Sequence, residues 1–231
     1  MAKKTVSAPA HAEAQVGEIF SKSEKFIETY RNHILAGAAF AVLIVVAVVG
    51  IRKYYLEPKE QEAQAALFPG ENYFQNREWD KALNGDSAIC TGFLAVADEY
   101  RLTKAGKLAN AYAGLCYYHL GNYGEAEAYL KKYRASDNVL SPALKSTIGD
   151  CHASLGNVEK AIAYFKQAAE EAGDKNLSPI YLKKAATAYE SLSDYKNALD
   201  IYKQIKNKYP ASGEAQAIDK YIERAKLLQT K

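Results

Sequence analysis

One pattern occurs three times in this chain, at offsets of 35 and then 37 residues, and it limits the fold more than any other feature. The copies begin at Gly114, Gly149 and Ala186. In each copy a ring-bearing residue follows three positions later, and an alanine follows twelve positions later, beyond a turn signal. A period in the thirties with two helices per unit is typical of stacked helical hairpins. The pattern therefore predicts an all-α solenoid.

The residue types within one copy explain this spacing. A small residue such as Gly114 lets two paired helices approach closely, and Tyr117 on the same helix face fills the remaining space. Gly121 and Gly156 suit a helix end that needs a left-handed backbone, whereas Ser193 is the exception in the third copy. The spacing and the turn residues thus support the same hairpin.

Two Ser-Pro pairs mark the starts of the first helices of two copies. Ser141-Pro142 and Ser178-Pro179 lie 37 residues apart. Serine is a favoured N-cap, and proline fits the first helical position. The sequence therefore predicts serine caps followed by helices that begin at the prolines.

At these residues the chain resembles the tetratricopeptide repeat family, whose helix-turn-helix units stack into a right-handed superhelix. The resemblance covers residues 105–210 as three repeats. Pro210 stands where the family usually has a proline after the last unit. The implied fold is an all-α solenoid of the tetratricopeptide repeat type.

The flanking segments resemble atypical ends of such a stack. Residues 59–104 look like a degenerate first repeat, in which residues 84–86 (Asn-Gly-Asp) interrupt the second helix and residues 87–100 form an inserted helix. The spacing of this unit is that of Tyr73, Trp79 and Ala82, which repeats the spacing of Tyr117, Tyr123 and Ala126. Residues 211–231 are amphipathic and predict the C-terminal capping helix that a solenoid end requires.

A second strong feature is the run of 18 uncharged residues ILAGAAFAVLIVVAVVGI from Ile34 to Ile51. As a helix this run is about 27 Å long, close to the hydrocarbon thickness of a bilayer. A buried core helix is one alternative, but such a helix is seldom apolar on every face. A cleaved signal peptide is another, which the long leader and the Arg-Lys-Tyr-Tyr sequence after the run disfavour. We predict an uncleaved transmembrane helix over residues 34–55 that contacts the lipid bilayer.

The leader before this run sets the expected topology. Residues 1–12 resemble a flexible tail, and apolar residues at helical spacing predict an amphipathic helix over residues 13–33. The leader carries five Lys or Arg residues, against three in the nearest flank beyond the span. Because cytoplasmic flanks are richer in basic residues, we predict a cytoplasmic N-terminus with the repeats across the membrane. The margin is small, since Arg52 and Lys53 directly follow the span, so the opposite topology stays open.

Composition and motifs argue against several functional classes. The 30 Lys and Arg against 27 Asp and Glu give a net charge of +3, too balanced for a protein that binds nucleic acid by neutralising phosphates. The three cysteines are odd in number and widely spaced, so they predict no disulfide framework. The sequence contains neither a phosphate-binding glycine loop nor a nucleophile elbow, and we expect no small-molecule substrate.

One cluster has residue types that suit chemistry. Cys116, His119, Cys151 and His152, with Asp150 beside them, suit a zinc site or a Cys-His nucleophile. However, His152 occupies the packing position of Tyr117, and equivalent positions on neighbouring helices lie about 9–10 Å apart, too far for a shared metal. We therefore expect buried packing thiols, with no catalytic residue, no metal and no cofactor, and we keep a metal-dependent or Cys-His enzyme as the third hypothesis.

The resemblance also implies a concave groove that binds proteins. In this family the first helices line the groove, about a quarter turn from the packing stripe. The expected groove residues are Leu115, Tyr118, His119, Ser146, Asp150, Ser154, Lys183, Thr187 and Glu190. One lysine and two acids do not support the carboxylate clamp that some family members use. The alternative is that these residues are merely solvated.

The layout of a short leader, one span and an Ala-rich repeat domain is similar to bacterial inner-membrane proteins of the ancillary SecYEG translocon subunit type, whose repeats lie in the periplasm. This resemblance implies a membrane scaffold in the bacterial envelope that binds protein partners, with translocon or chaperone components as the expected class. The competing hypothesis is a cytosol-facing, membrane-anchored receptor of the same construction. The sequence does not identify the partner.

Overall fold

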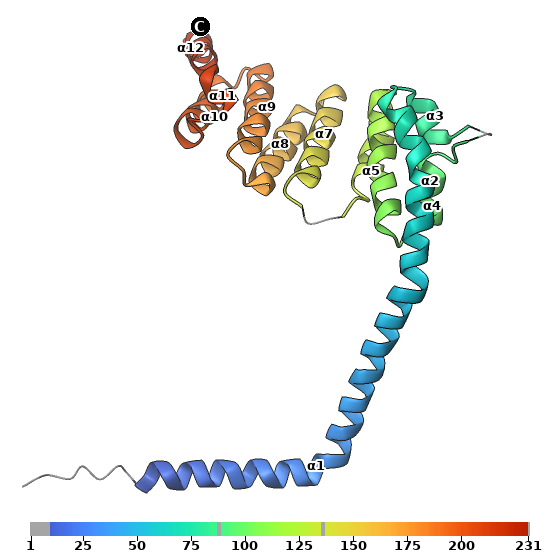
Figure 1. The fold of residues 1–231 in the computed structure, drawn as a ribbon. Helices are drawn as coiled ribbons and strands as arrows, with labels where there is room; N and C mark the ends of the chain where they lie inside the picture. Colours follow the sequence, from blue (N-terminus) through green and yellow to red (C-terminus); the bar gives the residue numbers. More distant parts are fainter. Residues whose placement is uncertain (1–9, 87–88, 135–136, 231) are drawn as a thin grey trace, which may run out of the picture. The chain divides into compact units, whose positions relative to one another are not determined.

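The computed structural model describes residues 10–86, 89–134 and 137–230 (Figure 1). Every regular element within these residues is a helix, and their only β-type pairing is the isolated bridge between Asp86 and Cys90. The chain divides into two compact units, Met1–Glu57 and Pro58–Lys231. The prediction of an all-α fold is confirmed for the described residues.

The first unit contains α1 (Ala10–Ile51), which a π-helical turn, η1 (Arg52–Leu56), follows. Residues 1–9 of the predicted tail lie outside the described residues. Residues 10–12 belong to α1, which corrects the predicted tail, because the segment after Pro9 is rich in helix-forming alanine. The side chains of residues 10–28 also lie outside the description, so the amphipathic face of the leader stays a prediction.

One helical stretch within the described residues is long and apolar enough to cross a membrane, judged by length and composition. Its most apolar window of 18 residues has a mean hydropathy of 3.0, and none of this window is buried in the protein. Phe40, Leu43 and Val46 are among its exposed side chains. A core helix of a soluble protein buries such residues, so their exposure fits the predicted span.

The second unit is built from four helical hairpins. They are α2 (Glu57–Gln75) with α3 (Trp79–Asn84), α5 (Lys104–His119) with α6 (Tyr123–Leu130), α7 (Leu140–Ser154) with α8 (Val158–Ala172), and α9 (Leu177–Ser191) with α10 (Tyr195–Lys208). Three further helices are α4 (Phe93–Glu99), α11 (Gly213–Gln216) and α12 (Ile218–Gln229). Helices α7 to α10 pack each against the next, as expected for a stack.

The turn inside each hairpin has the same geometry. In each hairpin, the second residue after the end of the first helix has a positive φ. These residues are Arg77 (61°), Gly121 (80°), Gly156 (77°) and Ser193 (59°). The next residue donates its backbone N–H to the carbonyl five positions earlier, in the pairs Glu78–Tyr73, Asn122–Tyr117, Asn157–His152 and Asp194–Tyr189. This bond closes a helix end of the Schellman type. Since two non-glycine residues adopt the strained backbone, the hairpin packing imposes the turn.

Small residues permit close helix crossings inside the hairpins. A Cβ atom on Gly114 would lie 2.6 Å from Cγ of Leu130, and one on Gly149 would lie 2.6 Å from Cε1 of Phe165. Both distances are shorter than carbon atoms tolerate, so glycine is required for these crossings. Ala186 is fully buried at the equivalent place of the next hairpin.

The first hairpin obtains its packing residue from outside. Helix α3 ends at Asn84, and Gly85 with φ of 86° turns the chain away. Phe93 of α4 fills the space instead, because it is fully buried and a Cβ on Gly70 would lie 2.7 Å from its Cε1. The inserted helix is therefore α4, shorter than the predicted segment 87–100, and it completes the core of the first unit of the stack.

The starts of α7 and α9 differ from the prediction, because both helices begin at the leucine before the Ser-Pro pair. Aspartates three residues before these leucines act as the caps, Asp137 for α7 and Asp174 for α9. Oδ1 of Asp174 accepts hydrogen bonds from the N–H groups of Asn176 at 2.7 Å and Leu177 at 2.9 Å. A carboxylate accepts hydrogen bonds from several free N–H groups, and its negative charge is stabilised by the positive N-terminal end of the helix dipole. A neutral serine hydroxyl lacks this charge interaction.

The C-terminal cap is two helices rather than one. The helical structure is interrupted at Ala217, between α11 and α12. This corrects the single helix predicted over residues 211–231. Ile218, Ile222 and Ala225 of α12 are buried in the same core cluster as Tyr202 of α10. Helix α12 thus covers the apolar face that the last hairpin leaves open.

Candidate functional site: the α7–α9 groove

A groove with a volume of about 630 Å³ lies between α7 and α9, and we call it the α7–α9 groove. Helix α8 contributes Val158 and Phe165, and α11 contributes Glu214. Its lining residues are Asp150, Ala153, Val158, Phe165, Ile180, Lys183, Lys184, Thr187, Ala188, Ser191 and Glu214. Apolar side chains and a few charged groups thus share one concave surface, the usual composition of a binding site.

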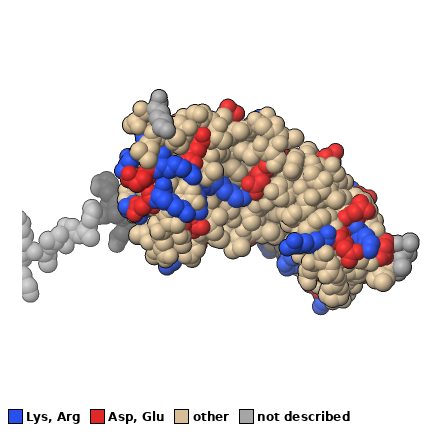
Figure 2. Space-filling model, turned by 90° about the horizontal axis from the view of Figure 1, so that it is seen from above, with Lys and Arg blue, Asp and Glu red and all other residues tan. Residues whose placement is uncertain are grey.

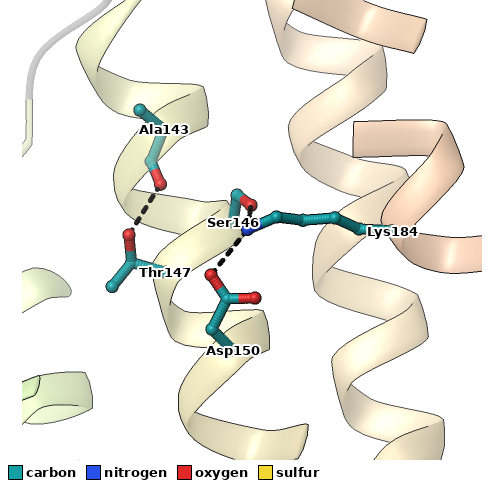
Figure 3. A network of polar contacts seen from close by, with 5 residues as sticks. All are labelled: Ala143, Ser146, Thr147, Asp150 and Lys184. Carbon is teal, nitrogen blue, oxygen red and sulfur yellow. Dashed lines mark hydrogen bonds and ion pairs between the residues drawn. The ribbon is translucent and has the colours of Figure 1, made fainter. Parts of the chain in front are cut away.

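Lys184 joins the two helices that flank the groove. Its Nζ donates to Oδ2 of Asp150 at 2.6 Å and to Oγ of Ser146 at 3.1 Å. Figure 3 shows the lysine extending from α9 to these two residues on α7, while Thr147 bonds within α7 to the carbonyl of Ala143. Ser146 is buried and the ion pair is partly buried, so this contact links α7 to α9 across the groove.

The end of the groove towards α12 is held by a second set of contacts. Nζ of Lys183 lies 5.0 Å from the ring centroid of Tyr221, within the range of a cation–π interaction. Glu190 forms an ion pair with Arg224 of α12. Oγ1 of Thr187 donates to the carbonyl of Lys183 at 2.9 Å, which leaves the Thr187 side chain exposed at the groove.

Residues 144–175 and residues 181–212 each match the family described as tetratricopeptide repeat. The chain contains tetratricopeptide repeats. The two matches start 37 residues apart and coincide with the α7–α8 and α9–α10 hairpins that form the groove. In the comparison with curated proteins, none matches this chain.

Within the tetratricopeptide repeats, the structure brings together part of the predicted groove set. Asp150, Lys183 and Thr187 line the α7–α9 groove. Ser146 is buried and does not line the groove, but it accepts a hydrogen bond from Lys184, which does. Glu190 forms an ion pair with Arg224 of α12. Ser154 is exposed near the end of α7 and is not a lining residue of this groove.

The three predicted groove residues on α5 are not part of the α7–α9 groove. Leu115 packs against the core cluster of Leu130, Leu144 and Ile148. The His119 ring stacks on Trp79 at 4.2 Å, towards the first hairpin. Burial and then the charge of Arg77 lower the pKa of His119. The α5 side chains therefore stabilise contacts to their neighbours instead of extending the groove.

Tyr118 contacts Tyr123 of its own hairpin and lies near Asp150 of the following repeat. Its ring lies 5.9 Å from that of Tyr123, centroid to centroid. Burial and then the nearby carboxylate of Asp150 raise the pKa of the Tyr118 hydroxyl. Tyr118 of α5 is therefore near Asp150, a lining residue of the groove, but is not itself part of the lining.

Sequence reasoning missed Lys184, which makes the contact between α7 and α9. The quarter-turn rule selected Lys183, the preceding residue, because it assumes the same rotation for every first helix. The side chain of Lys184 is long enough to reach two residues on the neighbouring helix. The sequence shows that Ser146 and Asp150 are four residues apart and share a helix face, but it does not indicate which basic residue binds them.

The candidate chemical cluster has the properties of packing residues. Cys116 and Cys151 are fully buried, and burial raises the pKa of the Cys116 thiol to about 12 and that of Cys151 to about 11. Thiols with such values stay neutral at physiological pH and are poor nucleophiles and metal ligands. Within the described residues, no group of three or more His, Cys, Asp and Glu side chains is placed to hold a metal ion.

Surface charge on the repeats is mixed. Figure 2 shows one face on which Lys and Arg atoms lie beside Asp and Glu atoms in several patches. The repeats also contain ion pairs between basic and acidic side chains, such as Lys206–Asp219 and Lys145–Glu171. On this face, basic and acidic groups are therefore mixed.

Proposed function

We propose that this chain is a membrane-anchored scaffold whose α7–α9 groove binds a segment of a partner protein. The observation that carries the proposal is a concave site of about 630 Å³ built entirely from two adjacent tetratricopeptide repeats and α11. Repeats of this kind are generally interaction modules, and the concave face of a stack is the surface on which they bind.

The chemistry of the groove favours a partner segment with an apolar anchor. Ala153, Val158, Ile180 and Ala188 give an apolar surface, and Ile180 is 38% exposed. The charge of Lys184 is already compensated by Asp150. Burial of apolar area then supplies most of the affinity, while polar groups at the rim orient the segment.

The proposed location is the bacterial inner membrane, with residues 34–55 as a single anchor, a cytoplasmic N-terminus and a periplasmic repeat domain. The exposed apolar helix and the five-to-three excess of basic residues on the leader side support this topology. The resemblance in layout to ancillary SecYEG translocon subunits supports translocon or chaperone components as the class of partner.

A cytosol-facing receptor of the same construction is the second candidate, because Arg52 and Lys53 directly follow the span. The groove would then serve a cytosolic partner by the same contacts. The two functions differ in topology alone, so the location of the repeats decides between them.

The test is site-specific photocrosslinking in intact membranes. A photoreactive residue at Thr187, which is exposed and lines the groove, should capture a specific protein. The same residue at Gln167, exposed on α8 and outside the groove lining, is the matched control. Ile180→Glu should reduce capture at Thr187 at least about tenfold, equivalent to about 1.4 kcal/mol. Equal capture at both positions, or capture unaffected by Ile180→Glu, would refute the groove as the binding site.

A further inference from the structure

The turn between α4 and α5 presents an apolar side chain between two basic ones. We call residues 100–104 the α4–α5 turn. Leu102 is 65% exposed, and Arg101 and Lys104 on either side are exposed as well. Within the described part of the chain, neither basic side chain has an ion-pair partner. Tyr100 and Thr103 of this turn pack against the protein, whereas Arg101, Leu102 and Lys104 are exposed and do not line the α7–α9 groove.

The α4–α5 turn is held rigidly. Oγ1 of Thr103 accepts from the N–H of Gly106 at 2.9 Å and donates to the carbonyl of Tyr100 at 2.7 Å. A Cβ on Gly106 would lie 2.0 Å from the same carbonyl oxygen, so the chain is packed closely here. Leu102 is therefore exposed on a fixed support rather than on a loop free to fold it inward.

The turn is also fixed to the start of α2. The carboxylate of Glu60 accepts from the backbone N–H of Lys104 at 2.6 Å and of Ala105 at 3.0 Å. Nζ of Lys59 lies 5.6 Å from the ring centroid of Tyr100. Figure 1 shows α4 and α5 beside α2 within this unit. The α4–α5 turn thus lies next to the first turn of α2.

Chain connectivity places this part of α2 near the proposed span. Glu60 is only five positions after Tyr55, the last residue of the span. Five residues extend over at most about 18 Å, whatever path the chain takes. The polar interface of a bilayer adds roughly 5–8 Å beyond each side of the hydrocarbon core. The α4–α5 turn is therefore tethered within reach of the membrane surface.

We propose that the α4–α5 turn is a second contact with the bilayer. Leu102 enters the interfacial region, and Arg101 and Lys104 bind the phosphate groups of anionic lipids. An apolar residue flanked by cations matches the two components of interfacial binding, apolar insertion and attraction to anionic headgroups. The Glu60 carboxylate is engaged by backbone N–H groups. This contact would fix the orientation of the repeat stack on the membrane, and it rests on the proposed anchoring by residues 34–55.

The experiment uses the full chain in vesicles that contain phosphatidylglycerol and brominated lipids. A fluorescent label is attached at Leu102→Cys, and the control is Leu227→Cys on α12, where the leucine is 67% exposed. The native cysteines are buried, so the label goes to the introduced thiol. We expect quenching at position 102 to exceed quenching at position 227 at least about threefold. We also expect Arg101→Glu with Lys104→Glu, or vesicles of phosphatidylcholine alone, to remove most of this difference.

Flotation of the vesicles separates the two ways of failing. If the chain floats with the vesicles but both labels are quenched equally, the anchor stands and the α4–α5 contact is refuted. If the chain does not float with the vesicles, the anchoring itself fails, and the contact fails with it. Quenching at position 102 that is equal in both lipid mixtures would contradict the role of the two basic residues.

Discussion

The close crossing of α5 and α6 can be tested with two glycines of the same hairpin. Gly114 and Gly124 are both helical, but only Gly114 faces its partner helix. A Cβ on Gly114 would lie 2.6 Å from Cγ and 2.9 Å from the backbone nitrogen of Leu130, so α6 itself must move. A Cβ on Gly124 would have no neighbour within 4 Å. The same substitution by alanine therefore has opposite expected effects.

The magnitudes follow from two opposing effects. Overpacking costs about 1–3 kcal/mol of stability. We expect Gly114→Ala to lie near the upper end of this range, because the backbone nitrogen of Leu130 cannot move aside as a side-chain atom can. Replacing a helical glycine by alanine returns about 1 kcal/mol in the helix interior. We expect Gly114→Ala to lose about 1–2 kcal/mol net, and Gly124→Ala to gain about 0.5 kcal/mol.

The assay is chemical denaturation of the fragment Pro58–Lys231, which forms its own compact unit and should be soluble and strongly helical. The helical circular dichroism signal reports unfolding of both variants and of the parent fragment. A Gly114→Ala fragment as stable as the Gly124→Ala fragment would show that α5 and α6 do not cross closely at this position.

Two further predictions concern ionisable groups. Hydrogen bonds from the N–H groups of Leu177 and Asn176 lower the pKa of Asp174 in the folded protein. The ionised Asp174 therefore stabilises the fold above the usual pKa of aspartate, and this stabilisation is lost as the pH falls through the lowered pKa. Asp174→Asn should keep the cap but flatten the decline in thermal stability below about pH 4, and an unchanged decline would contradict the cap. Because burial raises the pKa of Cys116 and Cys151, iodoacetamide at pH 8 should label neither thiol before denaturation, and Cys116→Ala with Cys151→Ala should leave capture at Thr187 intact. Stoichiometric zinc that this double variant loses would instead support a metal site.

The hairpin stack could be predicted from the sequence because its causes are local and periodic. Gly114 and Gly149 are required where two helices approach, and Gly121 and Gly156 adopt the positive φ that ends a first helix. Each requirement recurs at the same position of the pattern. The positive φ of Ser193 follows the same rule, although its residue type does not favour it.

The features that were missed depend on contacts between elements far apart in the chain. Phe93 completes the first hairpin from an inserted helix, at a distance in sequence that no fixed period describes. Lys184 bonds to Asp150, 34 residues earlier in the chain, and Leu115 packs against a cluster that includes Leu144 and Ile148 of the next hairpin. The direction of a side chain in a stack depends on how neighbouring hairpins pack, and the repeat spacing alone does not specify that packing.

The most direct test of the account is protease treatment of cells in which only the outer membrane has been opened. A membrane-anchored scaffold with periplasmic repeats predicts digestion of the repeat domain, while a fragment that contains the leader and residues 34–55 stays in the membrane fraction. Protection of the repeats until the inner membrane is broken would contradict this topology and favour the cytosol-facing receptor. Recovery of the intact chain in the soluble fraction would contradict the anchor itself.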